Sequence, residues 1–254
     1  MSKFEAAMRP LHERWLKRFA ELRSGRLVSK YRVDPERVAA PHLPLAPEDY
    51  DPDRVPSILL IGQSPYGPMT LDCDPPAERY TVEECHSVTR KVLGQTVTGN
   101  LACSPFWCFA KMLSAAVAER TGVVAKPLTN VVWTNVAKIS DGHSKVPPKN
   151  KLWEAQHKLA VETIAKEVEI YQPTLIVAVV GNLYEVAVRP ALASCAPGIE
   201  DRRAWRWNDT DRKPWTTRDS NPAVFWCGHP ARKSGKVLAS WVAEAASLIP
   251  QIGL

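Results

Sequence analysis

Four short runs of apolar and β-branched residues are the feature that most restricts the fold of this 254-residue chain. They lie at 57–61, 130–137, 174–180 and 223–227, and each has the length and composition of a strand buried on both faces. Helical segments separate the runs, so the strands must be joined by crossovers, which are right-handed in parallel sheets. The sequence therefore predicts an α/β protein, a three-layer α/β/α fold with a central four-stranded parallel sheet.

Six further segments are expected to be helices, at about 3–24, 81–93, 105–122, 151–171, 183–192 and 234–249. The segment 34–56 is rich in Pro and Asp and lacks periodicity, which predicts a wrapping loop. The polar segment 198–222 is interpreted as an irregular hairpin or flap. We expect a single domain over 1–254, with 1–55 forming an N-terminal helix and a wrapping loop packed on it.

Composition narrows the partners and the location of the protein. Lys and Arg number 33 against 27 Asp and Glu, a net charge of +6 that is compatible with a polyanionic partner. No segment has the roughly 20 apolar residues of a membrane span, and the N-terminus lacks the apolar core of a secretion signal. We therefore expect a cytoplasmic protein without membrane contact.

The six cysteines form no Cys-x-x-Cys pair, the spacing that is typical of metal and iron–sulfur sites. They are interpreted as structural thiols, and no metal site is predicted. A cluster assembled in space from four of these cysteines is the alternative.

Three of the predicted strands end in polar residues, at Gln63, Asn135 and His229. The carboxyl ends of parallel strands meet at one edge of a sheet, where ligands of such folds bind. The sequence therefore predicts a functional site at that edge. The alternatives are local: Gln63 and Ser64 cap the following helix, Asn135 satisfies turn backbone, and His229 is a plain strand exit.

Taken together, the strand ends resemble those of the uracil-DNA glycosylase superfamily. Residues 62–67 read GQSPYG and resemble its water-activating loop GQDPYH. Asn135 resembles the Asn that hydrogen-bonds the flipped base, and residues 229–234, HPARKS, resemble the HPSPLS loop whose His faces the base O2. Trp153-Glu154 also falls where that branch often has Trp-Glu. The resemblance covers roughly residues 55–250, and none of its motifs is fully matched.

This resemblance implies a uracil-DNA-glycosylase-like fold and a monofunctional DNA glycosylase that flips a base and hydrolyses its N-glycosidic bond, leaving an abasic site. The implied catalytic residues are Ser64, Asn135 and His229. The implied base-binding residues are Gln63, Tyr66, Asn135 and an aromatic face, Phe106 in preference to Trp107. The implied DNA-binding residues are Pro65, His143, Lys145, Arg232, Lys233 and Ser234. No cofactor is implied, and the expected partner of the monomer is DNA.

Departures from the family pattern keep the substrate open. Ser64 stands where the efficient uracil-excising branch has Asp, and serine cannot supply that negative charge. Asp72, Asp74 or Asp141 are the candidates to replace it. Gly67 in place of His and a long insertion after Pro68 motivate a second hypothesis, a modified pyrimidine larger than uracil, excised in defence against phages rather than in repair. The rival hypothesis is a DNA-binding member without catalysis.

Overall fold

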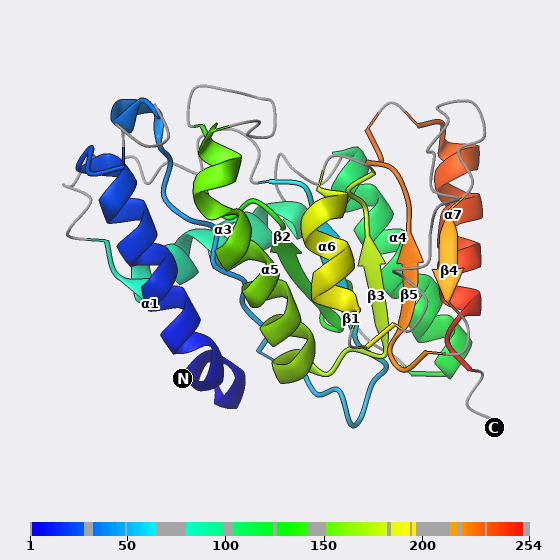
Figure 1. Cartoon of the computed structure of the whole chain (residues 1–254). Coiled ribbons are helices and arrows are strands. Elements are labelled where there is room, and N and C mark those ends of the chain that lie inside the picture. The colour runs from blue at the N-terminus through cyan, green and yellow to red at the C-terminus, as the bar shows by residue number, and fades with distance from the viewer. Residues whose placement is uncertain are drawn as a thin grey trace.

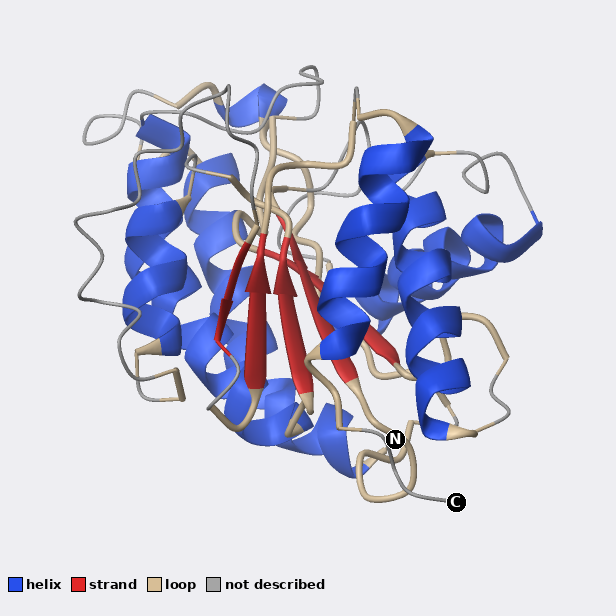
Figure 2. Cartoon of the chain, turned by 90° about the vertical axis from the view of Figure 1, so that its right-hand side faces the viewer, coloured by secondary structure: helices blue, strands red, loops and turns tan. Residues whose placement is uncertain are grey.

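The chain forms an α/β fold with helices on both sides of one sheet (Figures 1 and 2). The computed structural model describes residues 2–27, 33–48, 50–64, 80–98, 104–123, 126–141, 151–181, 184–193, 195–196, 214–217, 220–231 and 233–250. The strands are β1 (Ile58–Gly62), β2 (Val131–Asn135), β3 (Leu175–Ala178), β4 (Trp215–Thr217) and β5 (Ala223–Trp226). The helices are α1 (Lys3–Arg23), the 3-10 turn η1 (Pro35–Arg37), α3 (Val82–Thr98), α4 (Pro105–Thr121), α5 (Lys151–Tyr171), α6 (Glu185–Leu192) and α7 (Gly235–Ser247).

The strand order is β2-β1-β3-β5-β4, and the first four strands of this order are parallel. Four parallel strands and six helices lie at the predicted segments. The prediction of a four-stranded parallel sheet is corrected, because the described part of the sheet has five strands and is mixed. The fifth strand, β4, lies inside the segment interpreted as a hairpin or flap, and it pairs antiparallel with the strand that follows it, β5. Its three residues are only half-buried, and the segment lacks the apolar run that marks a strand covered on both faces.

The chain reverses direction across the sheet at β1. The next strand, β2, lies on one side of β1, and β3 lies on the other. In open α/β sheets such a reversal opens a crevice outside the carboxyl ends of the strands. The register aligns the last residue of β1, Gly62, with the last residue of β2, Asn135, so these two residues lie side by side at the carboxyl edge of the sheet.

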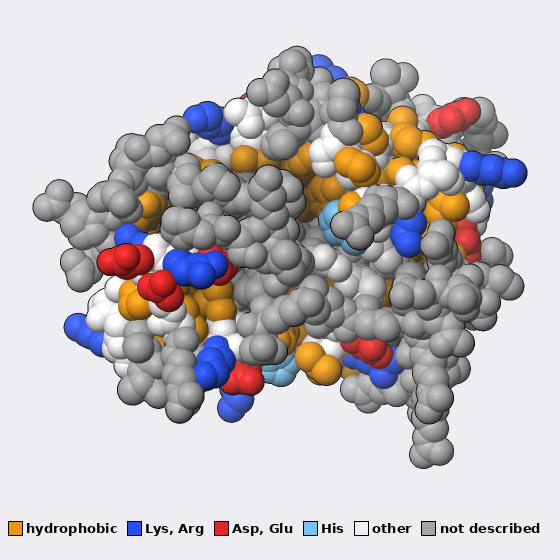
Figure 3. Space-filling model, turned by 90° about the horizontal axis from the view of Figure 1, so that it is seen from above, with side chains coloured by type: hydrophobic (Ala, Val, Ile, Leu, Met, Phe, Trp, Pro, Cys, Tyr) orange, Lys and Arg blue, Asp and Glu red, His pale blue; other side chains and the backbone are white. Residues whose placement is uncertain are grey.

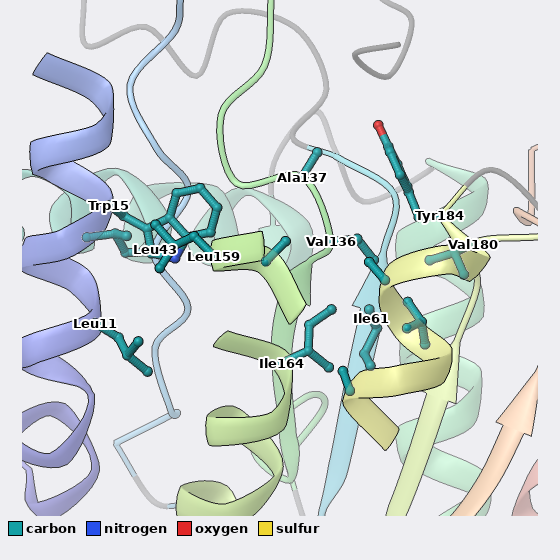
Figure 4. Packing of buried hydrophobic residues seen from close by; sticks show 14 of the residues in the cluster. Leu11, Trp15, Leu43, Ile61, Val136, Ala137, Leu159, Ile164, Val180 and Tyr184 are labelled. Atoms are coloured by element: carbon teal, nitrogen blue, oxygen red, sulfur yellow. The ribbon is translucent and has the colours of Figure 1, made fainter. Parts of the chain in front are cut away.

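Two apolar cores form because alternate residues of each strand point to opposite faces. Leu59 and Ile61 of β1 pack into the core beneath α1, α5 and α6, which Figure 4 shows from close by. Ile58 and Leu60 pack into the second core, beneath α4 and α7. All four side chains are completely buried, and each contributes about 1.5–3 kcal/mol by leaving water.

The helix α1 packs on the first core and contacts two other helices, α5 and α3. Ser2 and Glu5 form a capping box at its start, and buried Trp15 donates a hydrogen bond from Nε1 to Thr163 Oγ1 of α5 at 2.9 Å. On its α3 side, His12 Nδ1 lies 3.1 Å from His86 Nε2. Across the described residues, no helix is long and apolar enough to cross a membrane.

The His12–His86 contact predicts a loss of stability in acid. Burial, with the nearby His86 second, lowers the pKa of His12 to about 3 from 6.5. A histidine whose folded pKa is depressed takes up protons on unfolding, so its contribution is complete above the unfolded pKa and falls as the pH drops from about 6.5 towards 3. Between about pH 8 and about pH 5, we expect His12 alone to lower the free energy of unfolding by about 2 kcal/mol.

Urea denaturation at several pH values measures this loss. In the His12→Asn variant, which keeps a polar atom at the position of Nδ1 but does not titrate, the decline in acid should be shallower by that same about 2 kcal/mol. Parallel pH profiles for the wild type and the variant would contradict the prediction.

Candidate functional site

The centre of the site is a close contact between the ends of β1 and β2. A Cβ atom on Gly62 would lie 2.4 Å from Asn135 Oδ1 and 3.4 Å from Phe106 Cε2. Only glycine therefore leaves room at this point for the Asn135 side chain, which is 2% exposed. Gly62 and Asn135 thus form one unit, in which the backbone of one strand end supports the amide of the other.

Asn135 is held from its other side by His42, a residue that sequence analysis missed. Asn135 Nδ2 lies 3.2 Å from His42 Nδ1, and the buried His42 ring packs against Trp133 at a tilt of 38°, with ring centroids 4.0 Å apart. Burial, followed by the positive charge of Lys138, holds the pKa of His42 well below 6.5. The imidazole is therefore neutral at pH 7. No motif marked His42, because it lies in the segment 34–56, which has no periodicity.

Phe106 connects this unit to His229. It is the second residue of α4, and its ring lies nearly parallel to that of His229, at 21° with centroids 6.1 Å apart. Trp107, the second choice for an aromatic face, is 5% exposed and packs edge-on against Trp133. Gly62, Asn135, Phe106 and His229 therefore form a continuous row across the carboxyl ends of the strands.

His229 follows β5, and its ring has a defined hydrogen-bonding state. Ala231 donates its backbone N–H to His229 Nδ1 at 3.1 Å. Burial lowers the pKa of His229 from 6.5, so the ring is neutral at pH 7, and with Nδ1 accepting, the single ring proton is on Nε2. The side chain therefore presents a neutral N–H donor. Figure 3 views the molecule from above and shows hydrophobic side chains exposed between the parts drawn in grey.

Gln63 braces the ends of three strands. Its Nε2 donates to Val180 O beyond β3 at 3.1 Å, and its backbone oxygen accepts from Ala137 N–H beyond β2 at 3.0 Å. Its amide thus holds the loop after β1 in place. Ser64, the next residue, is half-buried at the end of the described loop.

The residues expected to contact DNA are only partly described. Ser234 is the N-cap of α7, and its Oγ accepts from Val237 N–H at 3.4 Å. Lys233 Nζ lies 5.9 Å from the ring centroid of Trp241. The other predicted residues lie outside the described part of the chain: Pro65, Tyr66, His143, Lys145 and Arg232.

Of the candidate carboxylates, Asp141 is described, and it is engaged in an ion pair. Arg37 binds it in a bidentate manner, with Nε 3.2 Å from Oδ1 and the guanidinium NH2 nitrogen 2.7 Å from Oδ2. A carboxylate paired in this way has its negative charge balanced, so we assign it no role in activating water. Asp72 and Asp74 lie outside the described residues.

A buried ion pair lies directly beside the site. Lys138 and Glu167 are both completely buried, and Lys138 Nζ lies 2.6 Å from Glu167 Oε1. Thr134, which precedes Asn135, donates to the same oxygen at 3.0 Å. Burial lowers the pKa of Lys138 and raises that of Glu167, while each charge opposes the shift of the other. The pair ties the end of β2 to α5.

The contact at Gly62 predicts opposite effects for two glycine substitutions. In Gly62→Ala, the new methyl group would displace the Asn135 amide, and we expect the free energy of unfolding to fall by about 1–3 kcal/mol. Gly94, within α3, has open space at its Cβ position, so Gly94→Ala should gain about 0.5–1 kcal/mol through helix propensity. Urea denaturation of both variants measures the difference, and equal shifts would contradict the crowding at Gly62.

Comparison with models of known protein families and with curated proteins finds no match for this chain.

Proposed function

We propose that this protein is a monofunctional DNA glycosylase with a uracil-DNA-glycosylase-like fold, which flips a uracil or a modified pyrimidine out of DNA and hydrolyses its N-glycosidic bond. The observation that carries the proposal is the row of Asn135, Phe106 and a neutral His229 at one edge of the sheet. Together these residues offer an amide, an aromatic face and an N–H donor. These are the groups needed to read a pyrimidine edge, to stack on its ring and to stabilise it as an anion.

The chemistry follows from the charge that develops as the bond breaks. The electron pair of the bond between sugar C1′ and the base nitrogen leaves with the base, and the sugar becomes an oxocarbenium-like cation. A hydrogen bond from His229 Nε2–H to the base O2 would stabilise the departing anion. Water then adds to C1′ and its proton neutralises the base, so the products are a free base and an abasic site. Because Ser64 supplies no charge to the cation, we expect slow excision.

The second candidate function is DNA binding without catalysis, within the same fold. It is favoured by Ser64 at the position of the family's water-activating carboxylate and by the pairing of Asp141 with Arg37. If the protein is a catalytic glycosylase, it has two proposed roles. One is housekeeping repair of uracil, and the other is excision of a hypermodified phage cytosine in antiviral defence. DNA as partner, the monomeric state and a cytoplasmic location belong to the same proposal.

A panel of labelled oligonucleotides tests the proposal. Each strand would carry uracil, hypoxanthine, 5-hydroxymethylcytosine or its glucosylated form, single-stranded or paired, and alkali would cut abasic sites after incubation. We expect cleavage at one class of pyrimidine, abolished in Asn135→Ala. His157→Ala, which removes a side chain from α5 outside the row, is the control and should retain activity. Binding of DNA without cleavage of any base would favour the second candidate.

A further inference from the structure

We propose that His42 is a positioning residue, which fixes the orientation of the Asn135 amide and thereby determines which pyrimidine edge the site accepts. This inference rests on the proposed glycosylase function. It concerns the direction in which one side-chain amide faces, because the two ends of an amide have nearly the same shape but opposite hydrogen-bonding character.

A pyrimidine offers one of two edges to such an amide. A uracil-type base presents an N3–H donor beside the O4 acceptor, whereas a cytosine-type base presents the N3 acceptor beside an N4–H donor. An asparagine that is free to rotate by half a turn pairs with either edge. An asparagine whose orientation is fixed pairs well with one edge and sets like atoms against each other at the other edge.

The contacts of Asn135 hold one orientation. Nδ2 faces His42 Nδ1 at 3.2 Å, and Oδ1 lies against the Cα of Gly62, where a Cβ would be only 2.4 Å away. A Cα–H group interacts favourably with an oxygen and gives no acceptor to an NH2 group. The Gly62 side therefore favours the oxygen, and the His42 side receives the nitrogen.

His42 is itself fixed in position, and its tautomer is tied to its contact with Asn135. Its backbone N–H donates to Lys138 O at 2.8 Å, and its ring packs against Trp133. The imidazole is neutral, so one ring nitrogen accepts and the other carries the proton. With Asn135 Nδ2 at Nδ1, Nδ1 is the acceptor and the proton is on Nε2, which has no hydrogen-bond partner among the described residues. Half a turn of the Asn135 amide would set Oδ1 against the lone pair of Nδ1. The amide is therefore coupled to the tautomer of His42.

Two substitutions of His42 separate its hydrogen bond from its packing. His42→Phe keeps an aromatic ring on Trp133 but removes the acceptor, whereas His42→Asn keeps a polar atom near the position of Nδ1. The measured quantities are kcat and KM for uracil and for 5-hydroxymethylcytosine in otherwise identical oligonucleotides. In His42→Phe we expect kcat for the preferred base to fall by roughly 10-fold or more. We also expect kcat/KM for the preferred base, divided by kcat/KM for the other base, to fall by roughly 10-fold or more.

His42→Asn should restore most of this ratio, and His157→Phe, a matched loss of histidine outside the row, should leave it unchanged. A merely structural role for His42 would lower both rates equally and leave the ratio intact. An unchanged ratio in His42→Phe would therefore overturn the inference.

Nitrogen NMR shifts of the wild-type His42 ring and Asn135 amide provide a readout that needs no catalysis. We expect a neutral ring with the proton on Nε2 and an Nδ1 that accepts a hydrogen bond, persisting well below pH 6.5. A ring protonated on Nδ1 at pH 7, or one titrating near 6.5, would overturn the inference that His42 fixes the orientation of the Asn135 amide. Absence of excision together with the expected shifts would reject the proposed function but would still support the fixed orientation of the Asn135 amide.

Discussion

For the proposed glycosylase reaction, excision by the His229→Leu variant is expected to be slower than by the wild type by roughly 10²–10³-fold, because the variant removes the N–H donor that we propose stabilises the departing base. The loss should be in kcat, since the hydrogen bond strengthens only as negative charge develops on the base. Single-turnover excision from the oligonucleotide that the wild type cleaves best measures this step directly. Leucine removes the polar group while preserving most of the side-chain volume.

The matched variants of His229 identify the atom responsible. His229→Gln places an amide N–H near the position of Nε2, so we expect it to recover part of the rate that leucine loses. His157→Leu removes a histidine from α5 and should excise at the wild-type rate. Burial already lowers the pKa of His229 below 6.5, so titration of this ring should not change the rate between about pH 7 and about pH 8. A leucine variant as fast as the wild type would exclude His229 from the chemistry.

Removal of one partner of the buried ion pair is expected to have the largest effect on stability. Lys138→Met leaves the Glu167 carboxylate completely buried without its counter-charge, and Glu167→Leu leaves the ammonium group in the same situation. Each single substitution should lower the free energy of unfolding by about 3–5 kcal/mol. The cause is the loss of hydration that the remaining charge suffered on folding, now without an opposite charge 2.6 Å away.

The double variant, Lys138→Met with Glu167→Leu, provides the test. It buries no charge, so we expect it to be more stable than either single variant, which requires a coupling free energy of more than about 3 kcal/mol in the double-mutant cycle. Urea denaturation at pH 7 supplies the four free energies of unfolding. Additive losses would mean that the two charges do not depend on each other.

Most of the secondary structure could be predicted because it follows from local patterns. The apolar runs at 57–61 and 130–137 correspond to β1 and β2. Pro105 begins α4 and Gly122 ends it, as the backbone preferences of proline and glycine predict. The fifth strand was missed for a related reason. Its three residues, starting at Trp215, are half-buried at the edge of the sheet, so no buried run marks them.

The residues around the site divide in the same way. The sequence placed Asn135 and His229 at one edge because each lies where a predicted parallel strand ends, and such strand ends meet at one edge. His42 was missed because it comes from the wrapping loop before β1. Lys138 and Glu167 resemble surface residues in the sequence, since charged side chains are almost never fully buried unless they are paired.

By itself, the sequence determined the six α-helices, the four buried strands β1, β2, β3 and β5, their parallel direction, and the edge at which polar strand ends gather. These follow from periodicity and from the handedness of crossovers, which act within or between neighbouring segments. Only the tertiary structure decided that the Asn135 amide lies between Gly62 and His42, and that a lysine and a glutamate pair in the interior beside it. Such contacts join residues far apart in the chain, and they depend on side-chain packing that no local pattern encodes.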